Sequence, residues 1–436
     1  MSIISGPNIK SDGIKLLLDP YNSKSITSEN LLTYSEDFTQ SSWQKSISAT
    51  IIPGANISPD GNNTATKLVL GKGYSGDIPI LNYFNVASYG TYTESLYVKY
   101  AGVRYAYFWW DNGSGNGCTF EIDLLTGATR NTRIGNNSYY TSFVTGSLDV
   151  GNGWYRIYIT AKNTNIISNV QVRLYISNDK WISSNFGTPS TYSLDESIGV
   201  YIWGWQAENS NFPTSYIKTT GSVITRNAID LSGNNNNGLM QNGAVIDYAN
   251  NSSYYFDGSD NWIVVTTTDG LGTANSTVNM SISIWAKIQI KNSYQHLVGF
   301  RSNGLTSTNW GNFYMLILDD GAYPGDNMET RLATLNSGNR QLGTDSYPYY
   351  NIWTNYTITA SGNIFKYYVN GTLLQTDTGL ATTTLGPNSS NFSIGRSPDG
   401  SFVALGNISD VRFYSNALSD TEVSNLYLAT RIKYGV

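Results

Sequence analysis

Residues 281–290 read Ser-Ile-Ser-Ile-Trp-Ala-Lys-Ile-Gln-Ile, and this stretch decides the fold class. Every second residue from Ile282 to Ile290 is apolar, and the residues between them are mostly polar. Successive side chains of a strand point to opposite sides, so a period of two places the apolar set on one face. The stretch therefore predicts a half-buried β-strand.

Strand signals of this kind recur along the chain, whereas helix signals are scarce. Residues 363–369 run into Asn370-Gly371 and then into 372–374. Asn-Gly between two such runs is typical of a hairpin, because both residues tolerate positive φ. Ser419-Asp-Thr-Glu422 predicts a capping box at the start of one short helix. We expect an all-β protein.

Composition excludes several classes of function. The 436 residues carry a net charge of −5, which argues against nucleic acid as a partner, because phosphate binding needs clustered Lys and Arg. The chain has one cysteine, Cys118, and one histidine, His296. These counts exclude internal disulfides and thiolate-rich or multi-histidine metal sites. Residues 1–10 lack the pattern of a secretory signal, and no apolar run is long enough to span a membrane.

The C-terminal half carries strings that resemble laminin-G-like domains of the concanavalin-A-type jelly-roll class. They include Phe256-Asp-Gly-Ser-Asp260, Trp353-Thr-Asn-Tyr356 and, most specifically, the run from Ile408 to Glu422. Asn355 departs from the pattern, because many relatives carry histidine after Trp-Thr. The resemblance implies a β-sandwich.

The preceding part of the chain resembles a carbohydrate-binding-module-like sandwich that is frequent in phage tail and virion proteins. Its matching strings are Asn30–Phe38, Gly151–Arg156 and Val200–Glu208. Residues 6–25 instead resemble the usual start of laminin-G-like virion proteins of tailed phages, where a short loop leads directly to a string like Asp230–Gly238.

These resemblances predict two β-sandwich (jelly-roll) domains, one inserted in the other. We expect residues 1–27 and 228–436 to form a discontinuous laminin-G-like domain. Residues 28–227 then form the inserted sandwich, since they stand where relatives have a short loop.

Catalysis is not expected. Concanavalin-type glucanases use a Glu-x-Asp-x-(x)-Glu strand motif, whose carboxylates act as nucleophile and acid. The nearest match is Glu121-Ile-Asp123, which Leu124, Leu125 and Thr126 follow, so the third carboxylate is missing. His296 lies in an expected strand and is interpreted as structural.

Glycan binding is the more attractive hypothesis, because sugar rings stack on aromatic side chains beside polar groups. In residues 104–112, Tyr107 and Trp109 share one strand face and Trp110 lies on the other, so one set could be exposed. Trp205 stands where relatives more often show Ala. The alternative is packing in the core or at a subunit interface. The candidates are Tyr107, Trp109, Trp110, Asp111, Trp205, Trp310, Tyr347 and Tyr349.

A bound Ca²⁺ is a possible cofactor, although none is required. Asp257 and Asp260 are oxygen donors in loop-like sequence, and many jelly-roll domains bind calcium at a loop rim. The alternative is that Asp257-Gly258 simply makes a turn between strands.

The resemblance implies a non-enzymatic virion structural protein of a bacteriophage, namely a capsid decoration, head-fibre or tail-fibre component. Its expected partners are other virion proteins, host surface glycans for attachment, and further copies of the chain in a homo-oligomer. Its expected location is the virion, assembled in the host cytoplasm. A secreted bacterial lectin or adhesin and a glycan depolymerase remain the alternatives.

Overall fold

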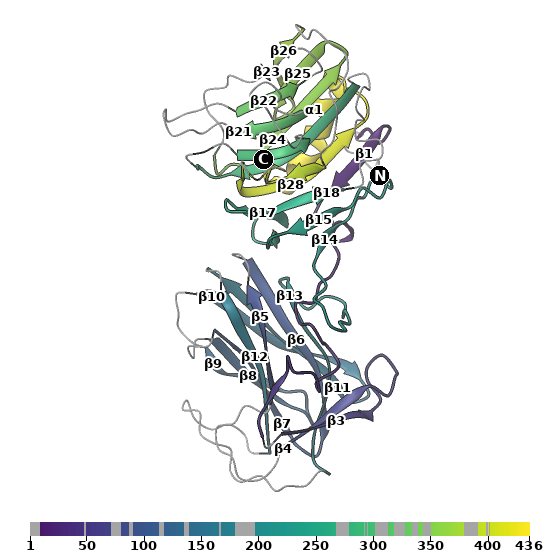
Figure 1. Ribbon diagram of the computed structural model, residues 1–436, viewed down its shortest axis with the longest axis vertical. Coiled ribbons are helices and arrows are strands. Elements are labelled where there is room, and N and C mark those ends of the chain that lie inside the picture. The colour runs from purple at the N-terminus through teal and green to yellow at the C-terminus, as the bar shows by residue number, and fades with distance from the viewer. Residues whose placement is uncertain are drawn as a thin grey trace, which may run out of the picture. The chain divides into compact units, whose positions relative to one another are not determined.

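The computed structural model divides the chain into two compact units. The discontinuous unit comprises residues 1–27 and 226–436, and the inserted unit comprises residues 28–225 (Figure 1). The structure describes residues 9–47, 49–70, 80–86, 90–112, 117–134, 139–164, 167–178, 197–266, 279–291, 293, 295–300, 313–317, 328–333, 339–342, 350–378, 391–397, 400 and 402–436.

Two antiparallel sheets form the discontinuous unit. The first runs in the order β16 (Val245–Asp247), β17 (Ser253–Asp257), β28 (Leu405–Tyr414), β19 (Asn279–Ile288), β24 (Thr354–Ser361), β25 (Ile364–Val369) and β26 (Thr372–Asp377), and β1 (Ile14–Leu18) also pairs with β28. The second runs in the order β14 (Asn227–Ala228), β15 (Gly238–Gln241), β18 (Trp262–Val265), β27 (Phe392–Ile394), β20 (Gln295–Phe300), β21 (Phe313–Ile317), β22 (Met328–Ala333) and β23 (Asn339–Leu342).

Strand β19 confirms the expected alternation but is buried on both faces. Ile282, Ile284 and the other apolar residues of its inner face lie in the core between the sheets. On its opposite face Trp285 is only 1% exposed, because the end of the chain covers it. The prediction of a half-buried strand reaching Ile290 was therefore wrong in two respects. The strand is buried on both faces, and it ends at Ile288, so that Ile290 is 60% exposed.

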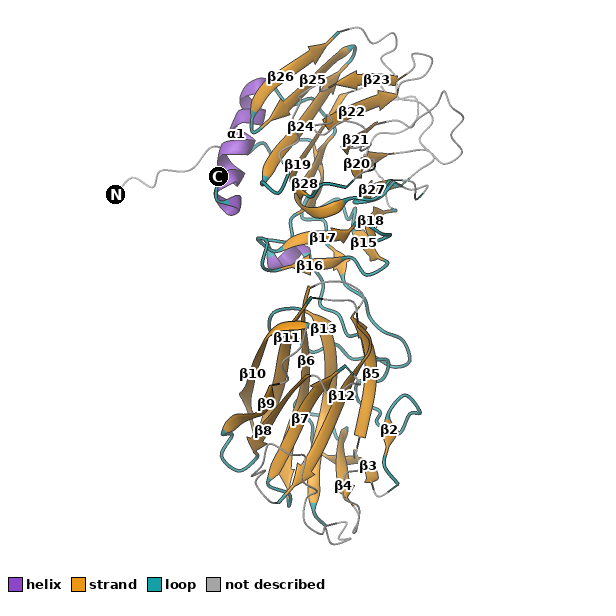
Figure 2. Cartoon of the chain, turned by 90° about the vertical axis from the view of Figure 1, so that its left-hand side faces the viewer, coloured by secondary structure: helices purple, strands orange, loops and turns teal. Residues whose placement is uncertain are grey.

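The covering segment is the helix α1 (Asp420–Thr430), followed by the 3-10 helix η2 (Arg431–Tyr434); a further 3-10 turn, η1, spans Ser23–Ser25. The predicted capping box is present, because Ser419 Oγ accepts from Glu422 N while Glu422 Oε2 accepts from Ser419 N. Val423 and Leu426 pack on Tyr368 and Tyr414 of the first sheet, and Figure 2 shows the helix along this face.

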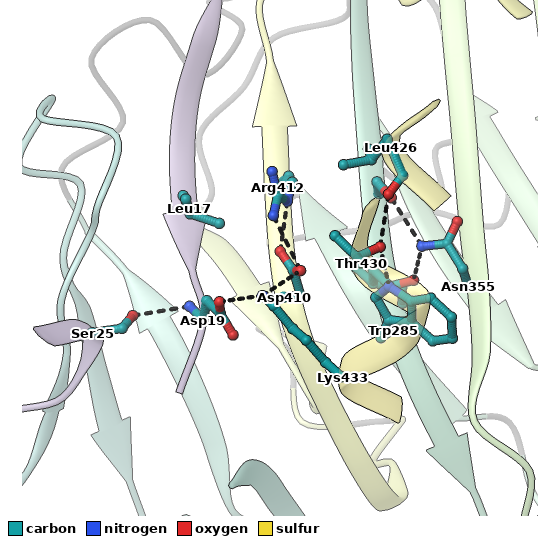
Figure 3. A network of polar contacts seen from close by, with 12 residues as sticks. Leu17, Asp19, Ser25, Trp285, Asn355, Asp410, Arg412, Leu426, Thr430 and Lys433 are labelled. Atoms are coloured by element: carbon teal, nitrogen blue, oxygen red, sulfur yellow. Dashed lines mark hydrogen bonds and ion pairs between the residues drawn. The ribbon is translucent and has the colours of Figure 1, made fainter. Parts of the chain in front are cut away.

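A buried network of charges joins β1 and its flanks to the chain end (Figure 3). Arg412 Nε lies 2.5 Å from Asp410 Oδ1. Lys433 Nζ lies 2.5 Å from Asp19 Oδ2 and 3.1 Å from Asp410 Oδ2. Burial alone would raise the pKa of Asp410, but the cations of Arg412 and Lys433 hold it below its usual range. The network therefore attaches the first segment of the unit to its last.

The inserted unit is a second sandwich of two antiparallel sheets. One sheet runs β10 (Tyr140–Gly151), β11 (Trp154–Asn163), β6 (Gly90–Ala101), β13 (Gly199–Asn209), β4 (Ala65–Leu70), β3 (Ala49–Asn56). The other runs β2 (Gln44–Lys45), β5 (Ile80–Val86), β12 (Ile167–Ser177), β7 (Tyr105–Asp111), β8 (Gly117–Asp123), β9 (Thr129–Ile134). Trp205 of β13 and Phe108 of β7 meet between the sheets, with ring centroids 5.6 Å apart.

Both units are thus layered β-structures, which confirms the predicted all-β fold class. Within the described ranges, no helix has the length and apolarity that a bilayer crossing requires.

Candidate functional site on the inserted sandwich

Strand β7 has one face in the core and one on the outside of its sheet. Phe108 and Trp110 point inward, where Phe108 meets Trp205 and Trp110 lies 5.2 Å from Phe84. Alternation then places Tyr107 and Trp109 on the outside. The register sets Arg173 of β12 and Thr119 of β8 on either side of Trp109, and Tyr175 and Glu121 on either side of Tyr107.

We call this outward surface the arginine face, because three arginines pair with carboxylates on it. Arg130 makes two hydrogen bonds to Glu121, of 2.8 and 2.9 Å. Arg104 Nη2 lies 2.7 Å from Asp123 Oδ2, and Arg173 Nη2 lies 4.0 Å from Asp111 Oδ1. The Arg104 and Arg130 side chains are 44% and 41% exposed, whereas Asp123 and Glu121 are 13% and 4% exposed. The face therefore presents guanidinium groups above its carboxylates.

Arginines also lie over the aromatic rings of this face. The Arg173 guanidinium lies 4.9 Å from the centre of the Trp109 ring, and Arg104 lies 5.2 Å from that of Tyr105. Trp109 is 6% exposed and Tyr107 2% exposed. The expectation that one aromatic set is exposed was therefore wrong, because the outward set is buried as well. A sugar could stack on the Arg173 side of the Trp109 ring only by displacing that arginine.

Two further candidates lie in the core, and the prediction of a surface role for them was wrong. Trp110 is inward on β7, and Trp205 is fully buried, with its ring 4.7 Å from that of Trp43. In a regular strand Trp203 and Trp205 would share a face. A β-bulge between Trp203 and Gln206 shifts the register, and Gly204 in this bulge has φ of +63°. Trp205 is thereby turned inward.

The remaining glycan candidates divide into two groups. Asp111 lies on the arginine face but is buried beside Arg173, so it is not an exposed polar group. Trp310, Tyr347 and Tyr349 lie outside the described residues, and their role stays a prediction.

The outward face of the opposite sheet is closed by the chain itself. Trp154 Nε1 donates to Ile57 O at 3.1 Å, and Trp203 Nε1 donates to Thr64 Oγ1 at 3.1 Å. Tyr216 packs on Trp203 with centroids 4.5 Å apart. The segments around Ile57 and Tyr216 cover these aromatics, which leaves the arginine face as the better binding surface.

The partial glucanase motif of the sequence lies on the arginine face, and its Asp123 is paired with an arginine. Glu121 and Asp123, the partial glucanase motif, both point outward on β8. The hydrogen bond from Arg104 lowers the pKa of Asp123, whereas a general acid needs a raised pKa. His296, in the other unit, is buried with Nε2 3.0 Å from Ser393 Oγ.

The two calcium candidates occupy a turn after β17. Asp257 Oδ1 accepts from Ser259 N at 2.8 Å, and Asp257 N donates to Asn261 Oδ1 at 2.9 Å. Asp260 is exposed, and its main-chain oxygen accepts from Asn242. In the described part of the chain, no three His, Cys, Asp or Glu side chains gather as metal ligands. Calcium binding at Asp257 and Asp260 stays a prediction.

Comparison with known proteins identifies part of the discontinuous unit. Residues 257–424 match the family model of the concanavalin A-like lectin/glucanases superfamily. This stretch is similar to that superfamily. The match confirms the resemblance seen at Phe256–Asp260 and Ile408–Glu422, while a phage origin and the carbohydrate-binding-module likeness stay predictions. No curated protein sequence matches the chain.

Solved structures give only distant similarity. The botulinum neurotoxin serotype D binding domain is 21% identical, with a TM-score of 0.35, and the match covers 46% of this chain and 49% of that one. The binding domain of Paraclostridial Mosquitocidal Protein 1 is 20% identical, with a TM-score of 0.36 and the same coverage. The serotype D ligand binding domain in complex with N-acetylneuraminic acid is 18% identical, with a TM-score of 0.36 and coverage of 48% and 51%. The chain spans about half the length of each.

Proposed function

We propose that the chain is a non-enzymatic structural protein of a bacteriophage virion that binds glycans on the host surface. The glycan-binding part is supported by the concanavalin-A-like match of residues 257–424 and by the arginine face of the inserted unit. The virion part is supported by the resemblance of residues 6–25 and 30–226 to virion proteins of tailed phages.

The arginine face is the observation on which the proposal depends. Arg173 lies on β12 and Arg130 on β9, with β7 and β8 between them, and Arg104 directly precedes β7. Each guanidinium group is paired with a carboxylate, that of Asp111, Glu121 or Asp123. Guanidinium donors in fixed positions suit the hydroxyl and ring oxygens of a saccharide. Because the carboxylates are engaged with arginines, the same surface holds a ligand without supplying a free acid for cleavage.

The proposed place of the chain is a capsid decoration, head fibre or tail fibre, assembled in the host cytoplasm with other virion proteins. Symmetric assembly of several copies would multiply weak glycan contacts into firm attachment. The proposal requires no cofactor.

Labelling of intact particles tests the virion part. An antibody against the inserted unit should decorate purified particles at regular positions seen by electron microscopy. Particles that carry no label, although the chain is present in the infected cell, would overturn it.

A secreted lectin or adhesin is the second candidate, because the match at residues 257–424 includes lectins. In that case the chain is found free in the medium or on the bacterial surface, and it binds glycans with the same face. Fractionating a producing culture separates the two candidates.

A further inference from the structure

Lys291 joins three segments of the discontinuous unit through its ammonium group. The residue follows β19, and its Nζ donates to Gly258 O at 2.6 Å and to Val403 O at 3.1 Å. Gly258 lies in the turn after β17, and Val403 precedes β28. One positive charge thus connects backbone carbonyls of two segments that are far apart in sequence.

The surroundings of this ammonium are those of a bound cation. Asp257 lies close enough for its negative charge to favour the ammonium form of Lys291, although burial lowers the pKa of Lys291 overall. Main-chain carbonyls and a carboxylate are the oxygen ligands that hard cations such as Ca²⁺ take in proteins. The turn that holds the two calcium candidates therefore already has a positive charge within it.

We propose that the Lys291 ammonium takes the place of a metal ion at the turn of residues 257–261. The main-chain oxygens of Gly258 and Val403, which hold the ammonium at 2.6 and 3.1 Å, are then a latent cation site in the turn of Asp257, and the site opens to Ca²⁺ once the ammonium is removed. This turn does not depend on calcium in the native chain, because the lysine satisfies its oxygens.

Lys291→Met tests the proposal, because methionine keeps the apolar stem and removes the charge. Lys287→Met is the matched control, since Lys287 is another half-buried lysine of the same unit, on β19, and it donates to a side chain, Asn250 Oδ1, at 2.9 Å. Melting temperatures of the full chain are compared in EDTA and in about 10 mM CaCl₂, roughly ten times the dissociation constant of the weakest calcium modules.

The proposal predicts that Lys291→Met melts below the native chain in EDTA and recovers by about 3 °C in calcium. Calcium should raise the melting temperatures of the native chain and of Lys287→Met by a smaller amount, which is the same for both. A calcium shift of Lys291→Met that equals the native shift overturns the proposal. If the methionine variant does not fold, Lys291→Gln serves in its place, with the same comparison of calcium shifts and the same two outcomes.

Discussion

Trp205 Nε1 donates a 2.9 Å hydrogen bond to Glu94 Oε1 between the two sheets of the inserted unit. Both side chains are fully buried. Burial raises the pKa of Glu94 well above its ordinary value of 4.5, although the bond from Trp205 opposes the shift. The folded chain therefore keeps this carboxyl protonated at pH values where the unfolded chain has lost the proton.

Glu94→Gln should change how the stability of the inserted unit depends on pH. A raised pKa contributes stability that is complete below the unfolded value and is lost as the pH rises toward the folded value. Glutamine keeps the acceptor for Trp205 and cannot ionise. We expect the native chain and the variant to have similar free energies of unfolding near pH 4. At higher pH the free energy of unfolding of the variant should exceed that of the native chain, by about 1.4 kcal/mol for each pH unit between the unfolded and folded pKa of Glu94. Urea unfolding followed by tryptophan fluorescence measures this, and parallel pH profiles would contradict it.

The buried ion pair of Arg412 and Asp410 should contribute far more to the stability of the discontinuous unit than a more exposed ion pair with the same N–O distance. Arg412→Met leaves the Asp410 carboxylate buried without its main partner, which should cost about 3–5 kcal/mol. The control is Lys366→Met, because Lys366 lies 2.5 Å from Asp420 with side chains 29% and 56% exposed. Its loss should cost less than about 1 kcal/mol. Denaturant unfolding that gives equal losses would refute this ranking.

Local patterns in the sequence were sufficient to predict several elements. The alternation in residues 281–288 specified β19, and the capping box of Ser419 and Glu422 specified the start of α1. Asn370 and Gly371 both have positive φ, as the hairpin between β25 and β26 requires. Each of these signals involves residues within a few positions of one another. They can therefore be recognised in the sequence without knowledge of the tertiary structure.

Features that depend on distant partners were not predictable in the same way. Trp205 turns inward because of a bulge, and a bulge leaves no mark in a simple alternation. Trp109 is covered by Arg173, which pairs with it only because β12 lies beside β7. The strand order that brings these residues together is a property of the whole sheet. The arginine face therefore emerged only from the structure, although Tyr107 and Trp109 had been placed on one face correctly.

Excision of the inserted unit should leave two folded proteins. Its two ends lie side by side, because Asn30 and Ile224 exchange hydrogen bonds of 2.8 and 2.9 Å. In the other unit, Thr27 N donates to Asn227 O at 3.0 Å, so those ends are adjacent too. We expect residues 28–225 alone, and residues 1–27 joined to 226–436 by a short Gly-Ser linker, each to unfold cooperatively. Circular dichroism during a urea titration checks this.

Removing residues 1–27 from the joined chain is the control, because it deletes β1 and Asp19, one of the two carboxylate partners of Lys433. That deletion should lower the stability of the unit markedly. Fragments that are unfolded before any urea is added would show that the two units depend on each other.

Arg104 offers the cleanest test of the arginine face. Arg104→Gln removes one partly exposed cation, paired with Asp123 at 2.7 Å. Lys218→Gln is its match within the same unit, because Lys218 is paired with Glu36 at 2.7 Å and is 56% exposed, away from the arginine face. We expect Arg104→Gln to weaken glycan binding about tenfold, the loss of one charged hydrogen bond, and Lys218→Gln to bind like the native chain.

The most direct measurement follows bound glycan and new reducing ends together while the purified chain is incubated with host polysaccharide. Recognition without cleavage predicts saturable binding that Arg104→Gln weakens and Lys218→Gln leaves unchanged, with the count of reducing ends constant throughout. An increase in reducing ends, or binding that ignores the Arg104 substitution, would contradict the account.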